Sequence, residues 1–162
     1  MTSYEEVYSR FLSKVEDTDL PNMSTEHAYK MLRQWLDSAI SYIELDRLKL
    51  KNDLSDRDSD NETFNVTLEN YEIELIAMYM QVAWYEPRVN SLEHTLLFMG
   101  TKDEKWTSQK DHWRLTKEIQ DGIRKRARKY CREHSMRYNS YITEDYEASE
   151  ANSGSDSETS GE

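Results

Sequence analysis

The most apolar stretch of the chain predicts a central helix over about residues 71–86. Between residues 71 and 85, twelve of fifteen residues are apolar or aromatic, and the exceptions are Glu72, Glu74 and Gln81. That density is too high for a helix with one apolar face, so we expect other elements to cover most of its circumference. The stretch is too short and too often interrupted by polar residues to span a bilayer. We therefore expect it to form the centre of a small helical bundle.

The residues around this stretch set its expected ends. Asn70 is a suitable N-cap, and Pro87 lacks the backbone donor that a continuing helix needs. We therefore expect the helix to stop or kink near Glu86. The mostly apolar segment 89–98 should pack as a continuation or as a short separate helix, which Gly100 ends.

Two further helices are predicted before the central one. Residues 1–16 contain a short N-terminal helix, because Ser3 and Glu6 have capping-box spacing and apolar residues recur on one face. The second helix begins after Ser24 or Thr25 and is amphipathic throughout. Its apolar stripe, at spacings of three and four, consists of Ala28, Met31, Leu32, Trp35, Leu36, Ala39, Ile40 and Ile43.

A long basic helix is predicted over about residues 108–134. Its expected inward stripe consists of Leu115, Ile119, Gly122, Ile123, Ala127 and Tyr130. In residues 136–142 apolar and polar positions then alternate weakly, which is compatible with a strand. We interpret residues 136–142 as an extended segment, and the low-complexity residues 143–162 as an acidic tail that does not fold alone.

Together these elements indicate an all-α fold, a small helical bundle over residues 1–142. Only four glycines and two prolines among 162 residues argue against an all-β chain with many tight turns. The length suits a single domain with a modest core. The side chains expected in that core are Trp35, Ile40, Ile76, Met80, Trp84, Ile119 and Ile123.

Residues 52–67 interrupt the helical pattern with an acidic segment, which we interpret as a solvated loop between helices. Asp56, Asp58 and Asp60 have the alternate spacing of a calcium-binding loop. The glycine and the bidentate glutamate of such loops are missing at their positions, so no metal site is predicted.

The charge of the chain is unevenly distributed. The net charge is −11, and the mean hydropathy of −0.97 indicates a thick polar surface. Residues 110–137 hold ten bases and four acids, whereas residues 143–162 hold seven acids and no base. A basic helix followed by an acidic tail is thus the main electrostatic feature of the sequence.

The basic helix allows three interpretations. It forms a solvated face, or it binds phosphate groups, or it docks on an acidic protein surface such as the loop or tail of a neighbouring copy. The overall negative charge weakens the second interpretation. The residues we predict at an interface with a neighbour or partner are Arg124, Arg128, Arg132, Tyr138, Tyr141 and Ile142.

The usual templates for catalysis are missing from the sequence. It has no glycine-rich phosphate loop, no G-x-S-x-G and no HExxH. Cys131, the single cysteine, and His134 lie one helical turn apart but make only half of a zinc site. No catalytic residue, metal or cofactor is therefore predicted. Glu74 and Gln81 either line a contact between subunits or form the one solvent-exposed side of the central helix.

Several segments together resemble one protein family. Over residues 20–142 the chain is similar to the head–tail connector proteins, also called adaptor or neck proteins, of tailed bacteriophages of Gram-positive hosts. The central match is EIELIA at 72–77, followed by Trp84–Pro87 and Val89–Ser91. Further matching residues are Trp35–Leu36, Ala39–Ile40, Asp53–Asp58, Phe98–Gly100, Lys102, Glu104–Lys105, Thr107–Gln109 and Tyr138–Tyr141.

The resemblance implies a structural protein and no enzyme. Such subunits assemble as a ring, usually of about twelve copies, beneath the portal of the DNA-filled head. The ring extends the DNA channel, through which the genome passes without sequence-specific binding, and it offers a docking face to the next neck or tail-completion protein. The expected location is the neck of the virion, assembled in the host cytoplasm, with no membrane partner.

The resemblance also implies that a segment near the C-terminus reaches the portal, and 138–142 is the candidate here. It would add a strand to an exposed sheet edge of the portal. The alternative function is a nucleic-acid-binding regulatory or packaging protein that uses the basic helix.

Overall fold

The computed structural model describes residues 1–17, 20–98 and 104–137, with side chains described for 107–135 in the last of these ranges. Four α-helices dominate: α1 (Tyr4–Leu12), α2 (Thr25–Leu45), α3 (Asn70–Phe98) and α4 (Glu104–Arg137). A 3-10 turn, Leu20–Asn22, precedes α2. Residues Met1–Cys131 form one compact unit, and a second unit begins at Arg132, inside α4. The fold is therefore a small helical bundle, as the sequence predicts.

Helix α2 follows its sequence pattern closely. Ser24 caps the helix, since its hydroxyl accepts a hydrogen bond from the His27 backbone N–H at 3.4 Å. The predicted stripe faces the core over most of its length. Its buried members are Leu32, Trp35, Leu36, Ala39, Ile40 and Ile43.

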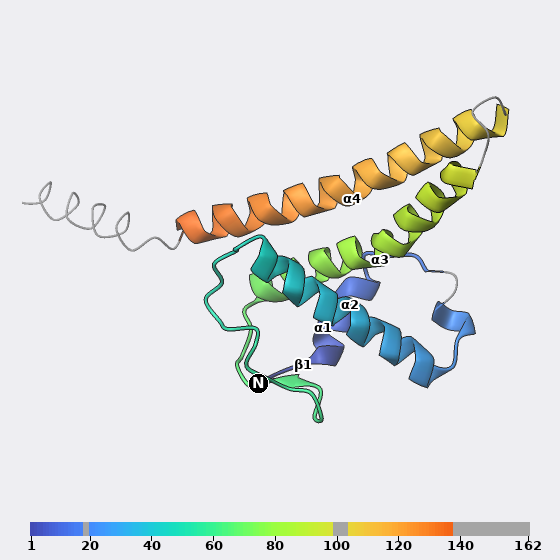
Figure 1. The fold of residues 1–162 in the computed structure, drawn as a ribbon. Helices are drawn as coiled ribbons and strands as arrows, with labels where there is room; N and C mark the ends of the chain where they lie inside the picture. Colours follow the sequence, from blue (N-terminus) through green and yellow to red (C-terminus); the bar gives the residue numbers. More distant parts are fainter. Residues whose placement is uncertain (18–19, 99–103, 138–162) are drawn as a thin grey trace, which may run out of the picture. The chain divides into compact units, whose positions relative to one another are not determined.

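Helix α3 supplies the largest share of the core and packs against both α1 and α2 (Figure 1). Between Tyr71 and Trp84 only Glu74, Met78 and Gln81 are not buried. Among the predicted core residues, Trp35, Ile40, Ile76, Met80, Trp84 and Ile123 are all buried. The expected covering of the central helix on most of its circumference is thus observed over this stretch.

The structure corrects the expected end of that helix. α3 does not stop near Glu86 but continues through Pro87 to Phe98. Pro87 lies on the exposed side of the helix. One turn earlier, the Trp84 carbonyl accepts a hydrogen bond from Arg88 Nη1 at 2.9 Å. The N–H that Pro87 lacks would have bonded the Ala83 carbonyl, so the helix continues through the proline at the loss of that one backbone bond.

The acidic segment 52–67, predicted as a solvated loop between helices, contains a small sheet that the sequence did not indicate. Two short strands, β2 (Arg57–Asp58) and β3 (Thr63–Phe64), form a hairpin there, and β1 (Thr2–Ser3) pairs with β3 beside the N-terminus (Figure 1). All pairings are antiparallel, in the order β1-β3-β2, with Thr2 opposite Phe64. Phe64 is fully buried. The segment thus closes one end of the core while its acids remain largely outside.

Helix α4 begins earlier and ends later than the predicted range 108–134. It runs back along α3, because Gln120 Nε2 donates to the Val82 carbonyl at 3.0 Å while Thr116 lines a groove with Leu92. Because Met136 and Arg137 are helical, the proposed extended segment cannot begin at 136. Its remaining residues, 138–142, and the acidic tail 143–162 lie outside the described residues.

The predicted inward stripe of α4 was partly wrong. Leu115 and Ile119 are 53% and 49% exposed, so Ile119 is not a core residue. The inward face is instead set by Thr116, Ile123 and Ala127. The polar Thr116 is tolerated there because its hydroxyl donates to the His112 carbonyl at 2.8 Å.

Candidate functional site

The most concentrated charge cluster joins α4 to the end of α2. Asp46 is the C-terminal cap residue of α2, and its side chain is only 3% exposed. Arg124 donates to it twice, from Nε at 2.9 Å and from Nη2 at 2.6 Å. Arg128 also donates through both Nε and Nη2, the former at 2.8 Å, and the Tyr79 hydroxyl donates at 2.6 Å. Two guanidinium groups and one phenol therefore converge on one carboxylate.

The electrostatics of this cluster follow from its geometry. Hydrogen bonds from Arg124 and then Arg128 hold the pKa of Asp46 well below its usual range. Burial, followed by the hydrogen bond to Asp46, raises the pKa of Tyr79. The charged form of Asp46 is thus favoured in the folded state, and it fastens α4 to α2 and α3.

The lowered pKa of Asp46 predicts an acid-dependent loss of stability. An unfolded aspartate titrates near pH 3.9. The pKa of Asp46 is lower in the folded state than in the unfolded state. Ionised Asp46 therefore contributes its full stabilisation above the unfolded pKa, and this contribution is lost as the pH falls from there towards the folded pKa. We expect the difference in unfolding free energy between the wild type and Asp46→Asn to keep its full value down to about pH 5 and to shrink from there towards pH 3. Urea unfolding at each pH measures it, and a difference that stays constant would contradict the assignment.

Two of the predicted interface residues belong to this charge cluster. Arg124 and Arg128 were expected to face a neighbour, but both use their guanidinium groups inside the chain, with side chains 32% and 48% exposed. Arg132 is exposed and lies in the second unit. The other three predicted interface residues, Tyr138, Tyr141 and Ile142, lie outside the described residues.

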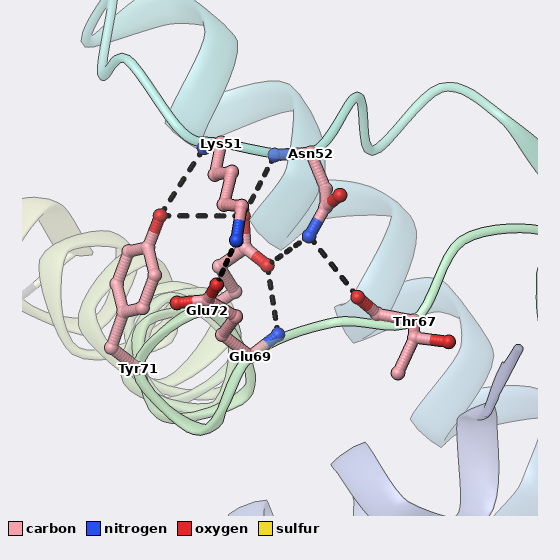
Figure 2. A network of polar contacts seen from close by, with 6 residues as sticks. All are labelled: Lys51, Asn52, Thr67, Glu69, Tyr71 and Glu72. Carbon is pink, nitrogen blue, oxygen red and sulfur yellow. Dashed lines mark hydrogen bonds and ion pairs between the residues drawn. The ribbon is translucent and has the colours of Figure 1, made fainter.

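A second polar network anchors the start of α3, and the sequence did not reveal it (Figure 2). Glu72 is fully buried and accepts hydrogen bonds from Asn52 N at 2.9 Å, Asn52 Nδ2 at 2.6 Å and Glu69 N at 2.9 Å. The Tyr71 hydroxyl adds a longer contact of 3.4 Å. Glu72 therefore ties the 46–69 connection to α3 through charge-assisted hydrogen bonds.

The cap of α3 differs from the predicted one. The Ile73 N–H donates to the Glu69 carbonyl at 3.1 Å, which makes Glu69, not Asn70, the N-cap. Glu72 then stands at the third helical position and reaches back to the N-cap N–H, as the acid of a capping box does. The spacing of Glu69 and Glu72 was the available signal, although an acid replaces the usual Ser or Thr at the cap.

The side chains of Glu74 and Gln81 make polar contacts within the chain. Lys14 Nζ forms an ion pair with Glu74, and Gln81 Nε2 donates to the Lys14 carbonyl at 3.0 Å. Arg10 lies 3.7 Å from the Glu74 carboxylate. Both side chains thus link the segment that follows α1 to α3, a role that neither sequence interpretation included.

A third polar contact joins Asp17 to Trp84, one of the residues that carry the family resemblance. The indole Nε1 donates to Asp17 at 2.5 Å, and Arg88 Nη2 donates to the same oxygen at 3.1 Å. The Arg88 guanidinium also stacks 3.7 Å from the centre of the Trp84 ring. The side chain of Asp17 is 5% exposed, so this carboxylate too is held in a largely buried site.

The single thiol and an acid of the calcium-like spacing both make contacts within the chain. Cys131 is buried, with Sγ 3.8 Å from the Lys49 carbonyl oxygen. Asp58 accepts hydrogen bonds from the backbone of Asp60 and Asn61 and so stabilises the hairpin turn. Within the described ranges, no group of three His, Cys, Asp or Glu side chains is placed to hold a metal ion.

Large apolar side chains are exposed at the end of α3 and along α4. Leu97 and Phe98 are 76% and 88% exposed, and Leu115 and Ile119 are about half exposed. Exposed apolar side chains indicate a contact surface only where they lie together in one patch.

No family model, curated protein or solved structure matches this chain. Among the described residues, no helix is both long and apolar enough to cross a membrane.

Proposed function

We propose that this chain is a structural, non-enzymatic subunit of a bacteriophage head–tail connector. By analogy with the resembling family, about twelve copies form a ring under the portal. The ring extends the DNA channel and presents a docking face to the next neck or tail-completion protein. The subunit is assembled in the host cytoplasm and resides in the neck of the virion.

The observation that carries the proposal is the structural role of the residues behind the resemblance. Glu72 anchors the start of α3, Trp84 is held by Asp17, and Leu54 is buried in the core. Residues that hold the core together are informative about the fold. A motif of such residues therefore indicates a shared fold more strongly than a motif of surface residues does. The resemblance therefore supports a connector-like bundle, and the connector function follows by analogy with that fold.

The alternative is a nucleic-acid-binding protein that uses the basic helix. Lys125, Arg126 and Arg132 are exposed and available for phosphate groups. Arg124 and Arg128, by contrast, are committed to Asp46. The net charge of −11 opposes association with DNA. A binding constant that falls steeply with salt would favour this alternative.

The proposal predicts that residues 138–142 are needed for binding to the portal. Two truncations of the full chain separate the segment from the tail: one lacks 138–162 and the other lacks only 143–162. We expect the first to lose binding to purified portal in a pull-down assay and the second to retain it. Circular dichroism should show an intact bundle in both. Equal binding by both truncations would contradict the docking role of 138–142.

A further inference from the structure

Helix α4 carries a second apolar stripe beside its inward one. Leu115, Ile119 and Gly122 follow one another at spacings of four and three, so they lie on one face of the helix. Leu115 and Ile119 remain about half exposed. Ile119 borders an open groove of about 460 Å³, which is lined by Ile119, Gly122, Lys125, Arg126 and Lys129.

Gly122 is not explained by packing inside the chain. A glycine in the interior of a helix costs about 1 kcal/mol relative to alanine. A Cβ atom built at Gly122 would meet no atom within 4 Å, so no neighbour in the described structure requires the missing side chain. A bare backbone at such a point allows a second helix to approach closely, as small residues do at helix crossings.

The charges along this face are arranged for an antiparallel copy of the same helix. Glu118 lies four residues before Gly122, and Arg126 lies four residues after it. Glu118 has only a long 3.8 Å contact with Arg114 of its own helix, and it is exposed. Arg126 is exposed, and no ion pair is observed for it within the described residues. If two copies cross at Gly122 in opposite directions, Glu118 of each faces Arg126 of the other.

The same symmetry places apolar surface against apolar surface. Residues at equal distances on either side of the crossing point face each other, so Leu115 lies opposite Lys129, whose methylene stem can cover it. Ile119 lies opposite the stem of Lys125. Glu118 and Arg126 are therefore complementary across the crossing point, and the same patch serves both copies, as an isologous contact requires.

We propose that two copies of this chain associate through α4, antiparallel and centred on Gly122, with two Glu118–Arg126 ion pairs. This contact goes beyond the proposed ring. Neighbours around a ring with a single rotation axis use two different patches, whereas this contact uses one patch twice. The dimer is a state of the subunit outside the ring. In it, the contact between the two copies covers the apolar stripe of α4.

Sedimentation velocity of the full chain over a concentration series at low salt tests the contact. We expect a reversible dimer for the wild type. Arg126→Glu places two like-charged pairs at the interface, so the dimer should weaken about tenfold or more. The double variant Glu118→Arg/Arg126→Glu restores opposite charges and should restore the dimer. Asp121→Arg, which reverses an exposed charge on another face of α4, should leave it unchanged.

Gly122→Leu separates association from folding. The side chain enters open space in the monomer and improves helix propensity, so Tm at low protein concentration should not fall. The same side chain blocks the crossing point and should abolish the dimer. A wild type that stays monomeric at every concentration, or a dimer that persists in both Arg126→Glu and Gly122→Leu, would overturn the proposal. This test measures only self-association and not binding to the portal. Its outcome is therefore independent of the connector proposal.

Discussion

Replacing Glu72 by glutamine is expected to cost about 3 kcal/mol of the free energy of unfolding, the largest effect of any single substitution considered for this chain. The carboxylate is fully buried and accepts from three N–H groups of Asn52 and Glu69. An amide keeps the shape but replaces one acceptor oxygen by a donor, which then faces another donor. At least one buried N–H group loses its partner.

Urea unfolding followed by circular dichroism at neutral pH measures this cost. Glu69→Gln is the matched control, because Glu69 belongs to the same network but its side chain is 39% exposed and pairs with Lys51. An exposed pair of this kind contributes less than about 1 kcal/mol. If the two variants lost equal stability, Glu72 would not be the anchor that the structure indicates.

Replacing Asp46 by asparagine is expected to cost about 2–3 kcal/mol and to loosen α4 from the rest of its unit. The carboxylate is 3% exposed and neutralises two guanidinium groups at once. Asparagine offers one acceptor oxygen in place of two and carries no charge. Because both arginines are about one third to one half exposed, water compensates part of the loss, which keeps the effect below that at Glu72.

Hydrogen exchange shows where this stability is lost. In Asp46→Asn we expect faster exchange in α4 between Thr116 and Cys131, while α2 keeps its protection. Asp37→Asn is the control, since Asp37 forms a similar ion pair with Arg57 but its side chain is 51% exposed. Uniformly faster exchange across all helices, or an equal effect in the control, would show that Asp46 does not fasten α4 specifically.

Local patterns predicted the helices well where packing follows a single face. Helix α2 has an uninterrupted stripe and a serine cap, and it forms almost as predicted. The face of α4 was misassigned because Leu115 and Ile119 are apolar whereas Thr116 and Gln120 are polar. The structure turns the polar pair inward, where the carbonyls of His112 and Val82 satisfy their donors. Hydropathy alone does not reveal such partners.

The hairpin and the charge clusters were missed for a different reason. Each strand of the sheet has only two residues, which is too short for an alternating pattern. The partner of Arg124 and Arg128 is Asp46, 78 and 82 positions earlier in the chain, so a count of local charge finds only a basic helix. Long-range pairing of this kind depends on the packing of α4 against α2 and α3.

Electron microscopy of this protein mixed with its portal tests the connector proposal most directly. The proposal predicts a ring of this subunit against the portal, with residues 138–142 at the contact. A portal that remains bare would contradict it, above all if the protein instead shifts duplex DNA in a salt-sensitive way.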